Sequence, residues 1–188
     1  MFLFNAIAYN TFMPKYSNLT GKVLGLLATG ALLGFTKDKQ QRLELIRDAD
    51  YIWQTIDQKE LLSLLRKFKV LGYVHGDNKK IDLSDRGKAR WLRYKLKDIK
   101  LSRQKRWDRK WRMVLFDIQE SKKKTRDALR RKLKEIGFLE FQKSVFVYPY
   151  PCRDEINFII NFFDVAEFVY YLETEISPDD LLKKNFKL

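Results

Sequence analysis

Residues 111–148, WRMVLFDIQESKKKTRDALRRKLKEIGFLEFQKSVFVY, limit the possible folds of this chain more than any other stretch. Side chains of residues 111–116 alternate between two faces, as in a strand that ends at Asp117. A helix is predicted over residues 121–136, with Gly137 as its stop signal, and residues 138–148 again favour strands. The predicted apolar face of that helix comprises Thr125, Leu129, Leu133 and Ile136.

The rest of the C-terminal half completes an α+β pattern. Pro149 and Pro151 end the strand-rich stretch, residues 152–163 predict a helix, and residues 167–176 predict a last strand. The order strand, helix, strand, strand, helix, strand is that of a ferredoxin-like βαββαβ domain, which we expect over residues 107–180. Its last strand is expected to lie at an edge and to extend the sheet of a second copy, giving a homodimer.

The N-terminal half begins with an unusually apolar stretch. Residues 23–35, VLGLLATGALLGF, predict a helix that is shorter than the ~20 residues needed to span a bilayer. We expect it to be buried through close-packed glycines, with a membrane-associating segment as the alternative, and we expect neither a signal peptide nor a membrane span. A short second helix follows, with Leu43 and Ile46 at helical spacing. Residues 1–19 suggest no role.

A third helix and a hairpin come next. Asp57 is placed to cap the helix, with Glu60 three residues later, and Gly72 to end it. Two short strands, residues 73–75 and 80–83, flank a turn at residues 76–78, and a further helix starts at Ser84 or Asp85. Three helices followed by a hairpin predict a winged helix over residues 20–100, with a generic helical domain as the alternative. The apolar stripe of the third helix comprises Leu61, Leu64, Leu65 and Phe68.

The charge of the chain indicates a polyanionic partner. The net charge is +14, and residues 86–112 hold 13 Lys and Arg against two Asp, a net +11. This pattern favours a segment that contacts phosphates; a solvated linker helix, or a module that binds RNA or anionic lipid, is the alternative. One cysteine, Cys152, and one histidine, His75, exclude an intrachain disulfide, a zinc site and a histidine-based triad. Cys152 is expected to be a small buried group at a helix start.

A winged helix places its third helix in the major groove and its hairpin on the DNA backbone. The polar side chains predicted to face double-stranded DNA from the third helix are Gln58, Lys59, Ser63, Arg66 and Lys67. Those predicted to contact the backbone are Lys79, Lys80, Arg90, Arg93, Lys95 and Lys97.

Two motifs in the C-terminal half resemble a known family. The run VLFDIQ, ending its strand at Asp117, and the later run QKSVF resemble the CRISPR-associated adaptation protein Cas2. The same domain preceded by a winged helix resembles the PaaX-type repressors of phenylacetate catabolism, over residues 20–176. The second resemblance implies a cytoplasmic transcription regulator that dimerises through its Cas2-like domain and requires no cofactor.

The first resemblance implies an alternative, a magnesium-dependent endonuclease or adaptation subunit. In that family the aspartate that matches Asp117 lies at the dimer axis, where two copies can hold Mg²⁺. A single carboxylate is a poor magnesium site, and Glu120 is the only other carboxylate near it in the sequence. A structural interpretation of Asp117 is that it helps to start the following helix.

Overall fold

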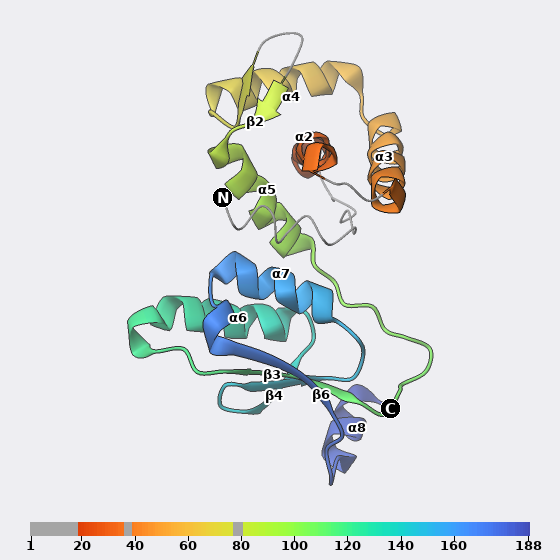
Figure 1. Ribbon diagram of the computed structural model, residues 1–188, viewed down its shortest axis with the longest axis vertical. Coiled ribbons are helices and arrows are strands. Elements are labelled where there is room, and N and C mark those ends of the chain that lie inside the picture. Colours follow the sequence, from red (N-terminus) through yellow and green to blue (C-terminus); the bar gives the residue numbers. More distant parts are fainter. Residues whose placement is uncertain (1–18, 36–38, 77–80) are drawn as a thin grey trace. The chain divides into compact units, whose positions relative to one another are not determined.

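The computed structural model describes residues 19–35, 39–76 and 81–188, and it divides into two compact units, one ending at Asp98 and the other comprising Ile99–Leu188 (Figure 1). The predicted hairpin tip, with Lys79 and Lys80, lies outside the described residues, as does nearly all of the segment 1–19. The protein is α+β, with helices and a short hairpin in the first unit and a four-stranded antiparallel sheet in the second.

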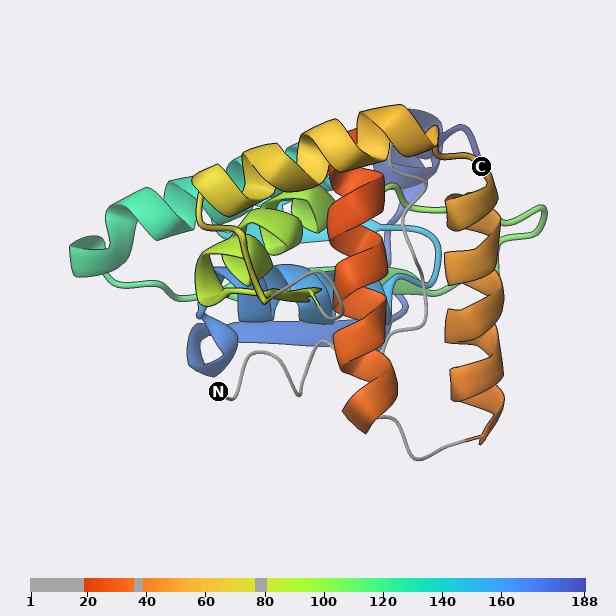
Figure 2. The ribbon, with the colours of Figure 1, turned by 90° about the horizontal axis from the view of Figure 1, so that it is seen from above.

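The first unit is built around α2 (Leu19–Phe35), which contacts α3 (Lys39–Gln54), α5 (Asp85–Asp98) and β2 (Ile81–Leu83). Figure 2 shows α2 and α3 side by side, with α4 (Gln58–Val70) crossing α2. Val23, Leu24 and Ala28 are buried, which explains why this helix is so apolar. Gly30, by contrast, is exposed, and no atom of the described residues would contact a Cβ placed on it, so close packing does not explain every glycine. Within the described ranges no helix is long and apolar enough to cross a membrane.

The second helix differs from the prediction. It is not short, because α3 has 16 residues, and both Leu43 and Ile46 are exposed. Among the described side chains of α3, Ile52 is buried instead. Helical spacing therefore predicted the helix correctly without showing which side chains enter the core.

The ends of α4 are fixed as the sequence predicted. The Asp57 carboxylate accepts a hydrogen bond from the backbone N–H of Glu60 at 3.0 Å, which satisfies a donor of the first turn. At the other end Gly72 has a φ of +67°, and the N–H of Tyr73 donates to the carbonyl of Phe68. This is the Schellman arrangement that favours glycine. The predicted apolar stripe is buried at Phe68 and half-buried at Leu61, Leu64 and Leu65.

The hairpin packs closely against the next helix. Strands β1 (Val74–Gly76) and β2 pair antiparallel, so Gly76 belongs to a strand and not to the predicted turn. The Ser84 hydroxyl caps α5 by accepting from the N–H of Gly87 at 3.0 Å. A Cβ on Gly87 would lie 2.0 Å from the carbonyl oxygen of Tyr73, so only glycine allows this approach.

The second unit contains one sheet with the strand order β4-β5-β3-β6, in which all neighbouring strands are antiparallel. Helices α6 and α7 lie on one face of the sheet and α8 on the other (Figure 1). The elements are β3 (Trp111–Phe116), η1 (Glu120–Lys122), α6 (Lys123–Glu135), β4 (Leu139–Gln142), β5 (Val145–Tyr148), α7 (Arg153–Phe163), η2 (Ala166–Phe168), β6 (Val169–Thr174) and α8 (Asp180–Phe186).

The core of this unit lies between the sheet and its two long helices. Gly137 ends α6 with a φ of +103°, as predicted, and Cys152 is buried at the start of α7. Burial raises the pKa of the Cys152 thiol to about 12, so the thiol stays protonated and unreactive. The fully buried side chains include Val114, Leu129, Leu133, Phe146, Ile156 and Ile159.

The C-terminal end differs from the prediction. Strand β6 spans six residues, shorter than the predicted 167–176, because a 3-10 turn precedes it. The additional helix α8 covers Trp111, whose indole N–H donates to the Asp179 carboxylate at 3.2 Å. Strand β6 lies at an edge of the sheet, as predicted.

Candidate nucleic-acid interface

Helix α4 exposes every polar side chain that the sequence predicted for DNA readout. The capped first turn and the glycine at the end fix the helix, and its apolar stripe faces the unit, so the opposite face is open. The exposed predicted residues are Gln58, Lys59, Ser63, Arg66 and Lys67.

The positive charge of this face is not neutralised nearby. Lys59, Arg66, Lys67 and Lys69 form no ion pair with any residue of the described ranges. The acidic Glu60 lies in the first turn, and Lys67 and Lys69 lie in the last. This order stabilises the helix because each charge interacts favourably with the nearer end of the helix dipole. The arrangement presents cations and hydrogen-bond donors together, which suits phosphate oxygens and base edges.

Sequence reasoning missed two apolar side chains on the same face. Leu62 is 58% exposed and Val70 is 88% exposed. At 100° per residue they share the angular range of Lys59, Ser63 and Arg66. The signal was present in the sequence for Val70, which lies opposite the stripe that enters the core, whereas Leu62 lies at the margin of that stripe.

The predicted backbone contacts on α5 fall into two groups. Arg93 and Lys97 are exposed, whereas the Arg90 guanidinium lies over the Tyr94 ring, 5.0 Å from its centroid, and is half-buried. Lys95 is only 9% exposed, with its ammonium 5.7 Å from the Trp91 ring. Desolvation lowers the pKa of Lys95 to about 8. Lys95 is therefore not displayed to a polyanion as Arg93 and Lys97 are.

The segment between α5 and β3 carries further exposed cations. It follows α5 without helical structure, so the basic stretch is not one continuous helix. Long cationic side chains in an extended segment can follow a phosphate backbone. The exposed basic residues here are Lys100, Arg103, Lys105, Arg106, Arg109 and Lys110.

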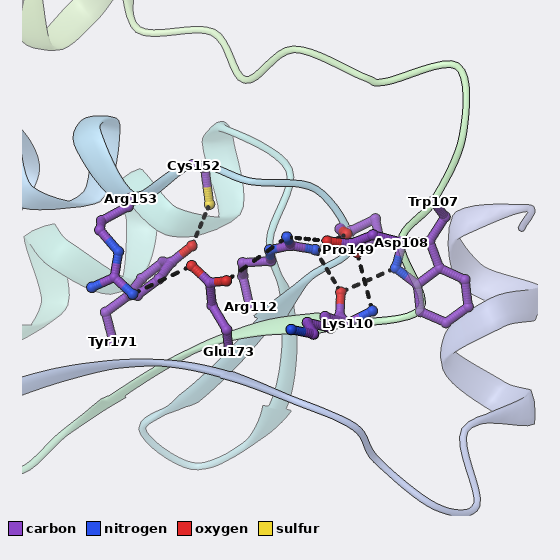
Figure 3. A network of polar contacts seen from close by, with 9 residues as sticks. All are labelled: Trp107, Asp108, Lys110, Arg112, Pro149, Cys152, Arg153, Tyr171 and Glu173. Carbon is purple, nitrogen blue, oxygen red and sulfur yellow. Dashed lines mark hydrogen bonds and ion pairs between the residues drawn. The ribbon is translucent and has the colours of Figure 1, made fainter.

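Arg112 ends the basic stretch and differs from all of these residues. It is 2% exposed, and its guanidinium binds both carboxylate oxygens of Asp108, at 2.6 and 2.5 Å (Figure 3). The same guanidinium donates to the carbonyls of Lys110 at 2.7 Å and Pro149 at 2.9 Å. Arg112 thus holds the segment 108–110 to the end of β5 and is not available to phosphates.

The network around Arg112 extends along the edge strand. Glu173 lies 4.0 Å from Arg112 and 3.3 Å from Arg153, whose guanidinium stacks over Tyr171 (Figure 3). The hydrogen bond from Arg112 lowers the pKa of Asp108 to about 2. Burial raises the pKa of the Tyr171 hydroxyl, which lies 4.0 Å from the Cys152 sulfur. These groups tie β6 to β3 and α7 and have a structural role.

Asp117 lies directly after β3 and is exposed. Its N–H donates to the carbonyl of Phe168 at 3.0 Å, which continues the pairing beyond the last strand residue. Contrary to the structural interpretation from the sequence, Asp117 does not cap the following helix, because the N-cap residues are Gln119 for η1 and Lys122 for α6, and neither makes a side-chain cap hydrogen bond. Among the described residues, no group of three or more His, Cys, Asp or Glu side chains is placed to hold a metal ion.

Comparison with known proteins finds a match in the C-terminal half. Residues 104–184 match the PaaX protein central Cas2-like domain. No curated protein matches the chain. The matched residues include the Arg112 network, Asp117 and α8 up to Lys184, in agreement with the resemblance of the sequence motifs. The α4 face lies outside the matched residues.

Proposed function

We propose that the protein is a PaaX-like transcription regulator that binds double-stranded DNA through α4. The observation that carries this proposal is the row of cations on the exposed face of α4, which form no ion pair with any described residue. Three helices followed by an antiparallel hairpin support the interpretation of the first unit as a winged helix. The match of the second half to the PaaX central domain supports the kind of regulator.

The second unit, in this proposal, is a ferredoxin-like dimerisation domain. Its strand order, with β3 and β5 inside and β4 and β6 at the edges, agrees with a split βαββαβ arrangement. Edge strand β6 carries two exposed apolar side chains, Tyr170 and Leu172. They pair across the ladder with Leu115 and Met113, both half-buried. A second copy that covers this patch would remove an exposed edge and an apolar surface together.

A symmetric dimer would present two copies of α4 to the two halves of a near-palindromic operator. Such a regulator works on cytoplasmic DNA and needs no cofactor for binding. Capture of genomic fragments by the purified full-length chain, with magnesium and with a chelator, tests whether the protein binds DNA and whether binding needs a metal ion. The proposal predicts the same enriched fragments in both conditions and a particle of twice 22.6 kDa by light scattering. Failure to enrich any fragment would overturn the proposed DNA binding. A purely monomeric particle would overturn the proposed dimer.

The magnesium-dependent endonuclease stays a prediction from the resemblance, with Asp117 as its ligand. Cleavage of short duplex and single-stranded DNA and RNA in magnesium or manganese tests it directly. A neutral amide is a much weaker ligand for a hard cation, so Asp117→Asn would abolish metal-dependent cleavage without unfolding an exposed site. Products that disappear in this variant would make the regulator an incomplete description.

A further inference from the structure

The exposed side of α4 carries two apolar side chains, Leu62 and Val70, inside a basic surface. Leu62, Arg66 and Val70 follow each other at four-residue intervals, so they form one row along the helix. Lys59 and Ser63 lie beside this row. Leu62 is 58% exposed, so the folded protein does not gain most of the free energy that burial of this side chain would give. A ligand that covers Leu62 while accepting the charge of its neighbours would recover that free energy.

The charge around Leu62 selects the kind of ligand. Lys59, Arg66, Lys67 and Lys69 make this face strongly positive, and within the described residues none of the four has an acidic partner. An apolar protein surface would leave these cations desolvated without compensation, whereas a DNA groove supplies phosphates to them. The apolar group that the major groove presents among polar base edges is the 5-methyl group of thymine.

We propose that Leu62 contacts the 5-methyl group of a thymine in the major groove and makes binding selective for that base. This inference rests on the proposed DNA-binding function and adds the chemical group that α4 recognises. Leu62 lies in the second turn of α4, and the N-terminal part of a recognition helix is the part that reaches base edges. Thymine in place of cytosine at this position would supply the apolar contact and an oxygen acceptor.

The position of the thymine relative to other contacts follows from the helix geometry. Arg66 lies four residues after Leu62, which is about 6 Å along the helix axis. Successive base pairs are about 3.4 Å apart, so the thymine should lie within about two steps of the base or phosphate that Arg66 contacts. Val70 lies about 12 Å from Leu62, in the last turn. Val70 is therefore a matched control, being apolar and exposed on the same face.

The test replaces thymine by deoxyuridine, which removes only the methyl group. Full-length protein first selects its binding sequence from a random duplex pool, and each thymine of that sequence is then replaced singly. We expect one position per half-site to lose about fourfold in affinity, the value of one buried methyl group. In Leu62→Ala that position should bind thymine and uracil equally, whereas Val70→Ala should keep the preference of the wild type.

The outcomes separate this inference from the function on which it rests. Enrichment of no sequence would overturn both. Selective binding in which no uracil replacement lowers affinity would overturn only the methyl contact. A preference for thymine that persists unchanged in Leu62→Ala would assign the contact to another residue and would also overturn it. Both substitutions are at exposed positions, and circular dichroism of each variant checks that α4 remains folded.

Discussion

Helices α4 and α6 are both basic, but their cations have different partners. On α6, Lys123 and Arg126 pair with Glu120 at 3.3 and 2.8 Å, and Arg130 and Lys134 both pair with Glu140. On α4, no cation pairs with an acidic residue of the described ranges. Most cations of α6 form ion pairs within their own unit, whereas the cations of α4 are available to a ligand. Net charge alone does not distinguish these two cases.

The largest expected effect comes from removing the available charge. Replacement of Lys59, Arg66 and Lys67 together by alanine should weaken binding to the selected operator by roughly 100-fold or more, because each loses a charged contact. A matched triple on α6, with Lys123, Lys124 and Lys134 replaced by alanine, removes the same charge. Fluorescence anisotropy should show less than about threefold change for the α6 triple. Equal losses in both triples would erase the distinction between the helices.

The second prediction concerns the buried cation of the network, Arg112. Asp108→Ala removes its main partner and should lower the free energy of unfolding by about 2 kcal/mol, since the buried guanidinium then keeps only Glu173, at 4.0 Å, as an acidic neighbour. Because the folded pKa of Asp108 is about 2, the stabilisation is complete above pH 4 and is lost as the pH falls through 2. Urea unfolding should therefore show a difference from the wild type that shrinks in strong acid. Arg109→Ala, at an exposed neighbour, should show almost none.

Lys95 is the exception among the cations of the first unit, and its replacement sharpens the comparison. Its folded pKa is about 8 against 10.5 for the ordinary side chain, so the charged form costs stability below pH 8. Lys95→Met should raise stability by about 1 kcal/mol at pH 7, and the gain should disappear between pH 8 and 10.5. DNA affinity should remain that of the wild type, unlike the loss expected for Arg93→Ala with Lys97→Ala. A large loss of affinity in Lys95→Met would show that this ammonium does contact DNA.

The smallest effect is expected at Glu140, which holds two cations of α6. Glu140→Gln should lower stability by about 0.5 to 1 kcal/mol, because the pairs with Lys134 and Arg130 are only partly buried. The hydrogen bond from Lys134, together with that from Arg130, lowers the pKa of Glu140, so this contribution is lost in acid. A thermal melt at neutral pH measures the difference. No change in stability would mean that the α6 pairs contribute nothing to the fold.

The sequence predicted most of the secondary structure for identifiable reasons. Alternation identified β3, helical spacing identified α4 and α6, and Gly72 and Gly137 correctly ended two helices. Helix α8 was missed because its seven residues are too short for a clear apolar period, although Asp179 precedes it as a cap residue.

Burial of charged side chains was the main failure of sequence reasoning at the candidate site. From the sequence we assigned Arg112 and Lys95 to the charged surface, because cations are rarely buried unless paired, but both are buried. Alternation nevertheless placed Arg112 on the same strand face as Val114 and Phe116, both of which are buried. The positions of Lys79 and Lys80 lie outside the described residues, so their predicted backbone contacts stay predictions.

The salt dependence of binding tests most directly whether the charge of α4 meets DNA phosphates. Log affinity of the full-length protein for one duplex is plotted against log salt for the wild type and the two triple variants. Each phosphate contact contributes a slope of about −0.9, so the α4 triple should flatten the line by about 2 to 3 while the α6 triple leaves it unchanged. Three parallel lines would contradict the account, because the cations of α4 would then release no counterions on binding.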